Sequence, residues 1–115
     1  MQKLYDPTTL SETHHGDTIF LTRIVQLFIH HMPLMAAELK KAYASRDWQN
    51  VYFYAHKMKA SIDLFGIKEL SSTIRSIEQQ GKAGTDTETL SHDIDHVSNT
   101  IDRCSEQLRE EFQTA

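Results

Sequence analysis

The chain has 115 residues, and its 12 basic and 16 acidic side chains give a formal net charge of −4. This length suits a single domain over residues 1–115, because a chain of this size can bury one core without a disulfide or a metal. The balance lacks the concentrated positive charge of a nucleic-acid-binding surface. Cys104 is the only cysteine, which excludes an internal disulfide and a cysteine-based zinc site.

The N-terminus and the apolar runs of the chain bear on where in the cell the protein is found. No apolar run follows the charged residues at the N-terminus, so this segment does not have the pattern of a signal peptide. No stretch approaches the ~20 apolar residues of a membrane-spanning helix. We therefore expect a cytoplasmic protein that binds neither membrane nor nucleic acid.

Helical periodicity extends through almost the whole chain, and strand patterns are absent. Asp6 followed by Pro7 predicts the start of a short helix that ends at Gly16. Asp17 predicts the start of a long helix, which Pro33 would kink near Ile29 without ending it. The apolar face predicted for this long helix comprises Phe20, Ile24, Leu27, His31, Leu34 or Met35, Leu39 and Ala42.

Three further helices are predicted in the second half of the chain. Asp47 would cap a helix that runs to Phe65 and stops at a left-handed Gly66. The next helix would span Lys68 to about Gln80, followed by a loop over residues 81–85. The last helix would begin at Asp86 or Thr87, and its apolar residues are Leu90, Ile94, Val97, Ile101, Cys104, Leu108 and Phe112. The expected fold is all-α, an antiparallel four-helix bundle with a short additional N-terminal helix.

A histidine occupies an unusual position on the helix that begins after Asp47. With Val51 as the origin and about 100° per residue, a buried stripe comprises Val51, Ala55, Met58, Ile62 and Phe65. His56 lies at about 140° on the same wheel, with Lys59 at about 80° and Asp63 at about 120°. Neutral imidazole is a nucleophile near neutral pH. An exposed histidine is therefore a candidate for chemistry, although the wheel position alone also fits a solvated surface residue.

The neighbours of His56 decide how open its ring is. Side chains lean toward the helix N-terminus, so residue 60 would shade the ring, and a small Ala60 leaves it open. Lys59 could pair with phosphoryl oxygens. Tyr52 flanks the ring one turn earlier and is a candidate for partner contact. Phe53 lies opposite the core stripe, where it could anchor a partner or pack under the N-terminal helix.

The spacing His-x-x-Lys-(Gly/Ala)-Ser, with Gly five residues after Ser, resembles the phosphorylatable motif of histidine-containing phosphotransfer (HPt) domains. Here the motif comprises His56, Lys59, Ala60, Ser61 and Gly66. The resemblance extends to four other features of these domains, which are Gly16-Asp17, Leu27-Phe28, Pro33 and Asp47-Trp48. Two positions depart from the family pattern: Ala60 stands where Gly is usual, and Ile62 where Ser or Ala is common.

The resemblance implies a phosphorelay intermediate. His56 would accept a phosphoryl group from a receiver-domain aspartyl phosphate and pass it to another receiver Asp, with Lys59 as charge support. Receiver domains and a hybrid sensor histidine kinase are the implied partners, and Tyr52, Phe53, Ala60 and Asp63 are the candidate contact residues. No cofactor is expected on this chain, because the receiver would supply Mg²⁺. The chain carries no Gly-rich phosphate loop, so ATP-dependent kinase activity is not expected.

Two other functions are compatible with the sequence. A non-catalytic helical adaptor could dock receiver or kinase domains through the same face. Seven histidines, including the i, i+4 pair His92 and His96, also raise the possibility of a metal site. Such a site needs a third and usually a fourth ligand, so no metal is expected. His31 and Cys104 lie on predicted apolar faces. His31 is expected to be a hydrogen-bonded, partly buried side chain, and Cys104 a packed thiol. A complete core also leads us to expect a monomer.

Overall fold

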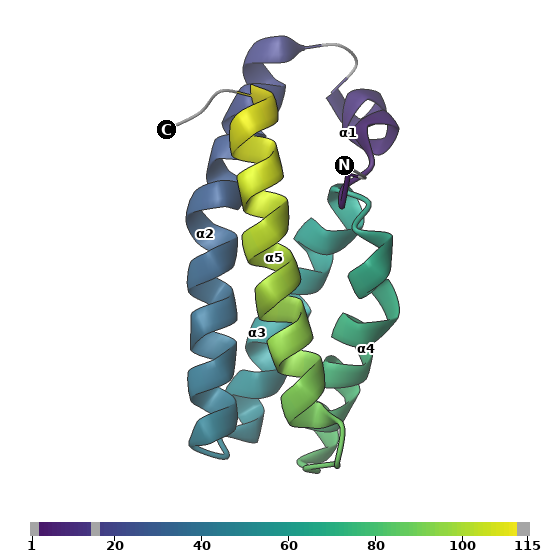
Figure 1. The fold of residues 1–115 in the computed structure, drawn as a ribbon. Coiled ribbons are helices and arrows are strands. Elements are labelled where there is room, and N and C mark those ends of the chain that lie inside the picture. The colour runs from purple at the N-terminus through teal and green to yellow at the C-terminus, as the bar shows by residue number, and fades with distance from the viewer. Residues whose placement is uncertain (1–2, 15–16, 113–115) are drawn as a thin grey trace.

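In the computed structural model, residues 3–14 and 17–112 are described, and they form five helices. The helices are α1 (Pro7–His14), α2 (Thr18–Ala44), α3 (Trp48–Leu64), α4 (Lys68–Ala83) and α5 (Leu90–Phe112). Figure 1 shows α2 to α5 side by side along one long axis, with the short α1 at one end. The described part of the chain contains no strand, and the predicted all-α class is confirmed.

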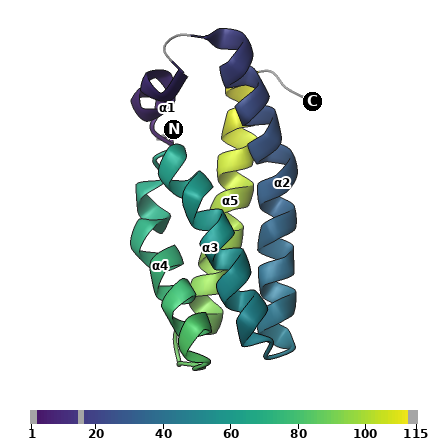
Figure 2. The same cartoon turned by 180° about the vertical axis from the view of Figure 1, so that it is seen from behind.

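The four long helices pack in a ring. Contacts join α2 to α3, α3 to α4, α4 to α5 and α5 to α2. Figures 1 and 2 show the chain reversing direction at each connection between these helices. The α3–α4 pair makes the most extensive contact, and its residues form the site described below.

Aspartates begin three of the helices, as predicted. Asp6 Oδ1 accepts a hydrogen bond from the Thr8 amide at 2.9 Å. Asp17 Oδ1 accepts one from the Phe20 amide at 3.0 Å, and Asp47 Oδ1 accepts one from the Asn50 amide at 3.2 Å. Each bond satisfies an amide that has no partner within its own helix. The predicted end of the first helix at Gly16 lies outside the described residues.

The turn between α3 and α4 requires a glycine. Gly66 has a φ of +63°, a left-handed conformation that strains residues with a side chain. A Cβ at Gly66 would also lie 2.6 Å from Asp6 Cβ. The chain before α1 approaches this closely because the Asp6 amide donates to the Phe65 carbonyl oxygen at 2.8 Å. In addition, the Leu4 amide donates to Gln107 Oε1 of α5 at 2.8 Å.

The core is a single cluster of side chains from all five helices and the chain before α1. On α2, however, the predicted face was partly wrong. Phe20, Leu27, His31 and Leu34 are exposed, and Leu39 and Ala42 are buried as predicted. The buried residues of α2 are Val25, Phe28, Ile29, Met32, Ala36, Leu39 and Ala42.

The composition of α2 explains the error. The helix continues through Pro33, and its first two turns and its centre are apolar on several sides, so two faces satisfy the helical period. By length and composition alone, α2 is apolar enough to cross a membrane, which exceeds the apolar content anticipated from the sequence. The core helix of a soluble protein can have the same length and composition, so this property alone does not identify a membrane-spanning helix.

The end of α4 and the start of α5 also differ from prediction. α4 continues to Ala83, so Gly81 is a buried helical residue and does not begin a loop. Gly84 ends the helix with a φ of +66°, which is the left-handed conformation common at helix ends. α5 begins at Leu90, later than predicted, because residues 85–89 form a loop that ends in a turn.

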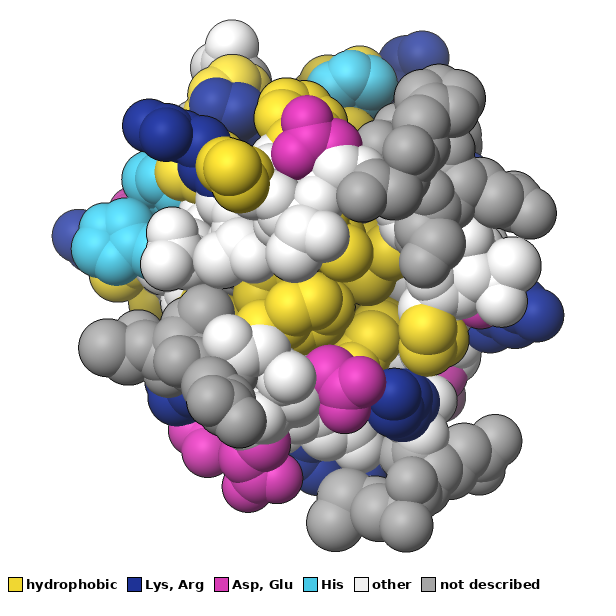
Figure 3. Space-filling model, turned by 90° about the horizontal axis from the view of Figure 1, so that it is seen from above, with side chains coloured by type: hydrophobic (Ala, Val, Ile, Leu, Met, Phe, Trp, Pro, Cys, Tyr) yellow, Lys and Arg dark blue, Asp and Glu magenta, His cyan; other side chains and the backbone are white. Residues whose placement is uncertain are grey.

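Figure 3 views the end of the bundle that carries α1. Hydrophobic side chains gather near the centre of this face, and charged side chains surround them. On the same side, a hollow of about 400 Å³ lies between residues 3–7 and residues 66–69. His56 is not among the residues that line this hollow.

Candidate functional site

The helix α3 presents His56 to solvent, as its wheel position predicts. All five residues of the predicted stripe are buried, namely Val51, Ala55, Met58, Ile62 and Phe65. The side chain of His56 is 57% exposed. A rigid helix anchored by one apolar face therefore holds an accessible imidazole on another face.

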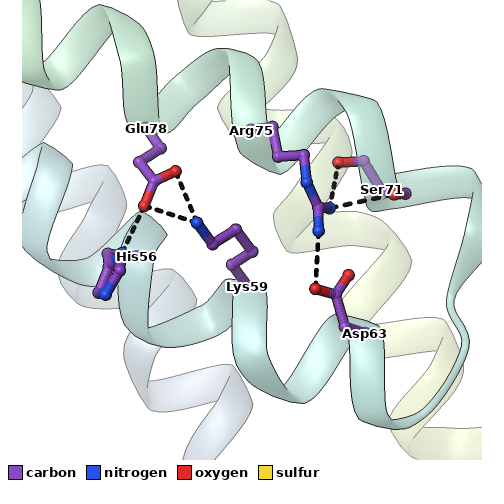
Figure 4. A network of polar contacts seen from close by, with 6 residues as sticks. All are labelled: His56, Lys59, Asp63, Ser71, Arg75 and Glu78. Carbon is purple, nitrogen blue, oxygen red and sulfur yellow. Dashed lines mark hydrogen bonds and ion pairs between the residues drawn. The ribbon is translucent and has the colours of Figure 1, made fainter.

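A buried carboxylate from α4 supports the ring of His56. Glu78 Oε2 lies 2.5 Å from His56 Nδ1, and the side chain of Glu78 is only 8% exposed. Figure 4 shows Glu78 reaching across from α4 to the two α3 side chains His56 and Lys59. The sequence analysis did not identify Glu78 as a site residue.

Lys59 completes this cluster. Its Nζ donates to both carboxylate oxygens of Glu78, at 2.9 Å and 3.1 Å. Burial is the largest single influence and would raise the pKa of Glu78, but the hydrogen bonds and charges of Lys59 and His56 together outweigh it and lower the pKa below its ordinary value. Glu78 is therefore an anion at neutral pH.

The ionised carboxylate fixes the tautomer of the histidine. An ionised carboxylate can only accept hydrogen bonds, so Nδ1 of His56 must carry the hydrogen in the contact with Glu78. In the neutral ring, Nε2 then holds the free electron pair. Figure 4 shows this second nitrogen on the side of the ring away from Glu78. The arrangement makes Nε2 an exposed nucleophile.

An aromatic ring flanks the imidazole. The rings of Tyr52 and His56 are stacked, with centroids 5.7 Å apart and planes inclined by 19°. Tyr52 lies one turn before His56 on α3, and the stacking limits the rotation of the imidazole. Glu78 and Tyr52 together restrain the ring in one orientation.

The other predicted contact residues lie around this cluster. Ala60 is exposed, one turn after His56. Asp63 forms an ion pair with Arg75 of α4 at 2.7 Å, so it joins an inter-helix contact next to the cluster of His56, Lys59 and Glu78 (Figure 4). Phe53 is 45% exposed, with Lys57 Nζ 5.1 Å from its ring centroid. The chain before α1 contacts the opposite end of α3, at Phe65 and Gly66. Of the two alternatives predicted for Phe53, packing under the N-terminal helix is therefore wrong.

One feature of the sequence could have identified Glu78 as a site residue. Glu78 directly follows Ile77 on the apolar stripe of α4, where a carboxylate is rarely buried without a partner. A glutamate at the edge of a buried stripe indicates a nearby cation or donor. The identity of that donor depends on the packing of α4 against α3, which a single helical wheel does not give.

Among the residues that the structure describes, the other histidines and the cysteine form no second site. Within the described ranges, 3–14 and 17–112, no group of three or more His, Cys, Asp or Glu side chains could hold a metal ion. His96 Nε2 lies 3.5 Å from Glu69 Oε2. His31 is exposed, so its predicted burial was wrong. Cys104 is fully buried as predicted, and burial raises the pKa of its thiol to about 12.

The fold and the site define a class of protein, a helical bundle that presents an exposed histidine held by a buried carboxylate. Comparison with protein families identifies which class this is. The family model described as the Hpt domain matches residues 23–114, which include α3, α4 and α5 in full. The chain belongs to the Hpt domain family and has a phosphotransfer role in two-component phosphorelays. Members of this family interact with receiver domains and kinases.

Two further comparisons returned nothing. Neither the search of curated proteins nor the search of solved structures found a match.

Proposed function

We propose that His56 accepts a phosphoryl group on Nε2 from the aspartyl phosphate of one receiver domain and passes it to the aspartate of another. The observation that carries this proposal is the 2.5 Å contact between His56 Nδ1 and Glu78 Oε2, combined with a side chain that is 57% exposed. The contact leaves the free electron pair on the exposed nitrogen.

The transfer balances without a proton donor or acceptor from solvent. Nε2 attacks phosphorus, the N–P bond forms, and the P–O bond to the receiver aspartate breaks with its electron pair on the departing carboxylate. Nδ1 keeps its hydrogen, so the phosphorylated ring is a cation that faces the Glu78 anion. In the second transfer, a receiver carboxylate attacks phosphorus and the electron pair returns to Nε2. Positioning and charge neutralisation dominate such reactions.

A protein partner suits this site better than a small substrate. His56 lies on the outer face of α3, and it does not line the hollow between residues 3–7 and 66–69. An exposed ring on a rigid helix can enter the active site of a second protein, which would supply Mg²⁺ and the acidic residues that bind it. Tyr52, Phe53 and Ala60 are the proposed contact residues around the ring, and Asp63 lies at their edge.

The proposal also covers the domain organisation, oligomeric state and cellular location of the chain. Residues 1–115 would act as one domain and as a monomer, in the cytoplasm, with a hybrid sensor histidine kinase upstream. ATP would not be a direct phosphoryl donor. The chain would be a carrier whose phosphorylation depends on its partners.

The test is phosphotransfer from a panel of phosphorylated receiver domains. We expect label on His56 that is labile in acid and stable in base, and none in the His56→Gln variant. His92→Gln is the matched control, because His92 is another exposed histidine on a different helix. Label that persists in His56→Gln would contradict the assignment. Receiver binding without label in the wild-type chain would favour a non-catalytic adaptor.

A further inference from the structure

A glycine on α4 allows an unusually close approach to α3. Gly81 is buried within α4. A Cβ at this position would lie 2.6 Å from Tyr52 N and 3.0 Å from both Tyr52 Cα and Val51 Cγ1. Two of these three atoms belong to the backbone of α3, so a side-chain rotation cannot relieve the contact. Any larger residue at position 81 must push the two helices apart.

This approach lies one turn from the contact between Glu78 and His56. Gly81 follows Glu78 by three residues on α4, and Tyr52 precedes His56 by four residues on α3. Residues three or four apart lie on the same face of a helix. The spacing of the helices at Gly81 therefore sets how far Glu78 must reach.

A second contact restrains α4 on the other side of Glu78. Arg75 precedes Glu78 by three residues, and its guanidinium binds Asp63 Oδ2 at 2.7 Å. Arg75 is also held by Ser71 of its own helix (Figure 4). Glu78 thus lies between an ion pair and a backbone contact that both join α4 to α3. The ion pair is exposed and adaptable, whereas the backbone contact is rigid.

The contact between Glu78 and His56 depends on the distance between α3 and α4. Its length is 2.5 Å, and a hydrogen bond weakens steeply once the heavy atoms separate beyond about 3.5 Å. Because Glu78 is buried against the helix pair, an outward movement of α4 would withdraw its carboxylate from the ring. Glycine is also a poor helix former, so its place within α4 is explained by the contact rather than by helix stability.

We propose that Gly81 is a positioning residue for phosphotransfer, because its missing side chain lets α4 approach Tyr52 closely enough for Glu78 to hold the Nδ1 hydrogen of His56. This inference rests on the proposed function for the role of His56. Its structural part, the control of the His56 tautomer by Gly81, stands independently of any transfer reaction.

The experiment compares the wild-type chain with Gly81→Ala by ¹⁵N NMR of the His56 ring at a pH where the ring is neutral. In the wild type, we expect the hydrogen on Nδ1. In Gly81→Ala, we expect the signals to shift toward the tautomer with the hydrogen on Nε2, because the contact that selects the tautomer is weakened. The rate of phosphotransfer from a receiver domain should fall about tenfold or more, the range seen when an orienting partner is lost.

Two controls separate this effect from a general loss of stability. Ile101→Val removes a methylene from the core on α5, a helix that carries no site residue. It should lower the melting temperature without changing the His56 signals. A double variant, Gly81→Ala with Glu78→Gln, tests the route of action. If Gly81 acts through Glu78, adding Gly81→Ala to Glu78→Gln should slow transfer by less than about twofold, because the two changes are not additive.

Three results would overturn the inference. Unchanged His56 signals in Gly81→Ala would show that the tautomer does not depend on the helix spacing. Additive losses in the double variant would show that Gly81 acts elsewhere. Should Gly81→Ala lose its helical circular dichroism, the spectra are repeated in trimethylamine N-oxide, which favours compact states. A chain still unfolded there would mean that the contact serves the whole fold.

If His56 is not the phosphoryl carrier, the NMR and labelling experiments would give a different combination of results. In that case the wild type would show the Nδ1 hydrogen and Gly81→Ala would shift it, but His56→Gln would retain the phosphoryl label.

Discussion

Glu78 is an anion because two donors hold it, and this makes its contribution to stability depend on pH. Its pKa in the folded chain lies below the ordinary value of 4.5, since the hydrogen bonds and charges of Lys59 and His56 together outweigh burial. Unfolding restores the ordinary pKa. The ionised form therefore stabilises the fold fully above about pH 4.5, and that stabilisation is lost as the pH falls through the lower folded value.

The first prediction concerns this pH dependence. From about pH 6 to about pH 3, the wild-type chain should lose more free energy of unfolding than Glu78→Gln, which has no carboxyl to protonate. At neutral pH, Glu78→Gln should be less stable by about 1–3 kcal/mol, because Lys59 loses a charged partner. Urea unfolding at several pH values measures both effects. Parallel pH profiles for the two chains would contradict the role of Glu78.

The second prediction concerns access to His56. Ala60 is exposed and lies one turn after the histidine, so a leucine there would cover the ring without entering the core. Ala60→Leu should slow phosphotransfer about tenfold or more, with a melting temperature within about 2 °C of the wild type. Ala37→Leu is the matched control, because Ala37 is exposed on α2. Equal transfer rates for both variants would show that residue 60 does not control access.

Residues on one helix could be predicted from the sequence, and residues that meet across helices could not. The exposure of His56 and its proximity to Lys59 follow from helical geometry within α3. The pairing of both residues with Glu78 depends on how α4 packs against α3, and the two helices approach each other closely at Gly81. The prediction of a loop at Gly81 was wrong because residues 81–85 contain two glycines and no apolar anchor, which is a loop pattern. Its contact with α3 depends on how the two helices pack, which the pattern of one helix does not show.

At the scale of the helices, α2 shows the limit of periodicity. The spacing of Phe20, Leu27 and Leu34 fits one helical face, but these three residues are exposed. The core is built mainly from the adjacent face, which includes Phe28 and Met32. A helix that is apolar on several sides does not reveal by its pattern which side meets its neighbours. The positions of α3 and α5 determine which face of α2 is buried.

The third prediction tests the face of α2 that is buried. Leu34 is 58% exposed and Leu39 is fully buried on the same helix. Leu39→Ala should lower the free energy of unfolding by about 2–5 kcal/mol, since it leaves a cavity in the core. Leu34→Ala should change it by about 0.5 kcal/mol or less, because no cavity forms. Denaturant unfolding measures both. Comparable losses would mean that Leu34 is packed in the core as Leu39 is.

At the scale of the whole molecule, one core connects all the helices. Cys104 lies in that core on α5, and its thiol has a pKa of about 12 because it is removed from water. The thiolate is the reactive form of cysteine. Reaction of this thiol therefore requires an opening of the fold, as well as deprotonation.

The fourth prediction uses Cys104 as a reporter of that opening. At about pH 8, a disulfide reagent should modify the native chain more than about a thousandfold more slowly than the urea-unfolded chain, because only open states react. The absorbance of the released thiolate gives both rates. A small free thiol added to the native chain should react at once and shows that the reagent is active. Rapid modification of the native chain would contradict the single closed core.

The contact between Glu78 and His56 has a consequence for the pH dependence of signalling. Under the proposed function, Nδ1 keeps its hydrogen before, during and after the phosphoryl group is present, so loading and unloading pass through the same arrangement of charges. Neither step releases or takes up a proton from water. The His56 ring therefore adds no pH dependence of its own to either transfer. Whether phosphate flows toward one receiver or returns to the other depends on the abundance and phosphorylation state of those partners, as in a reversible exchange.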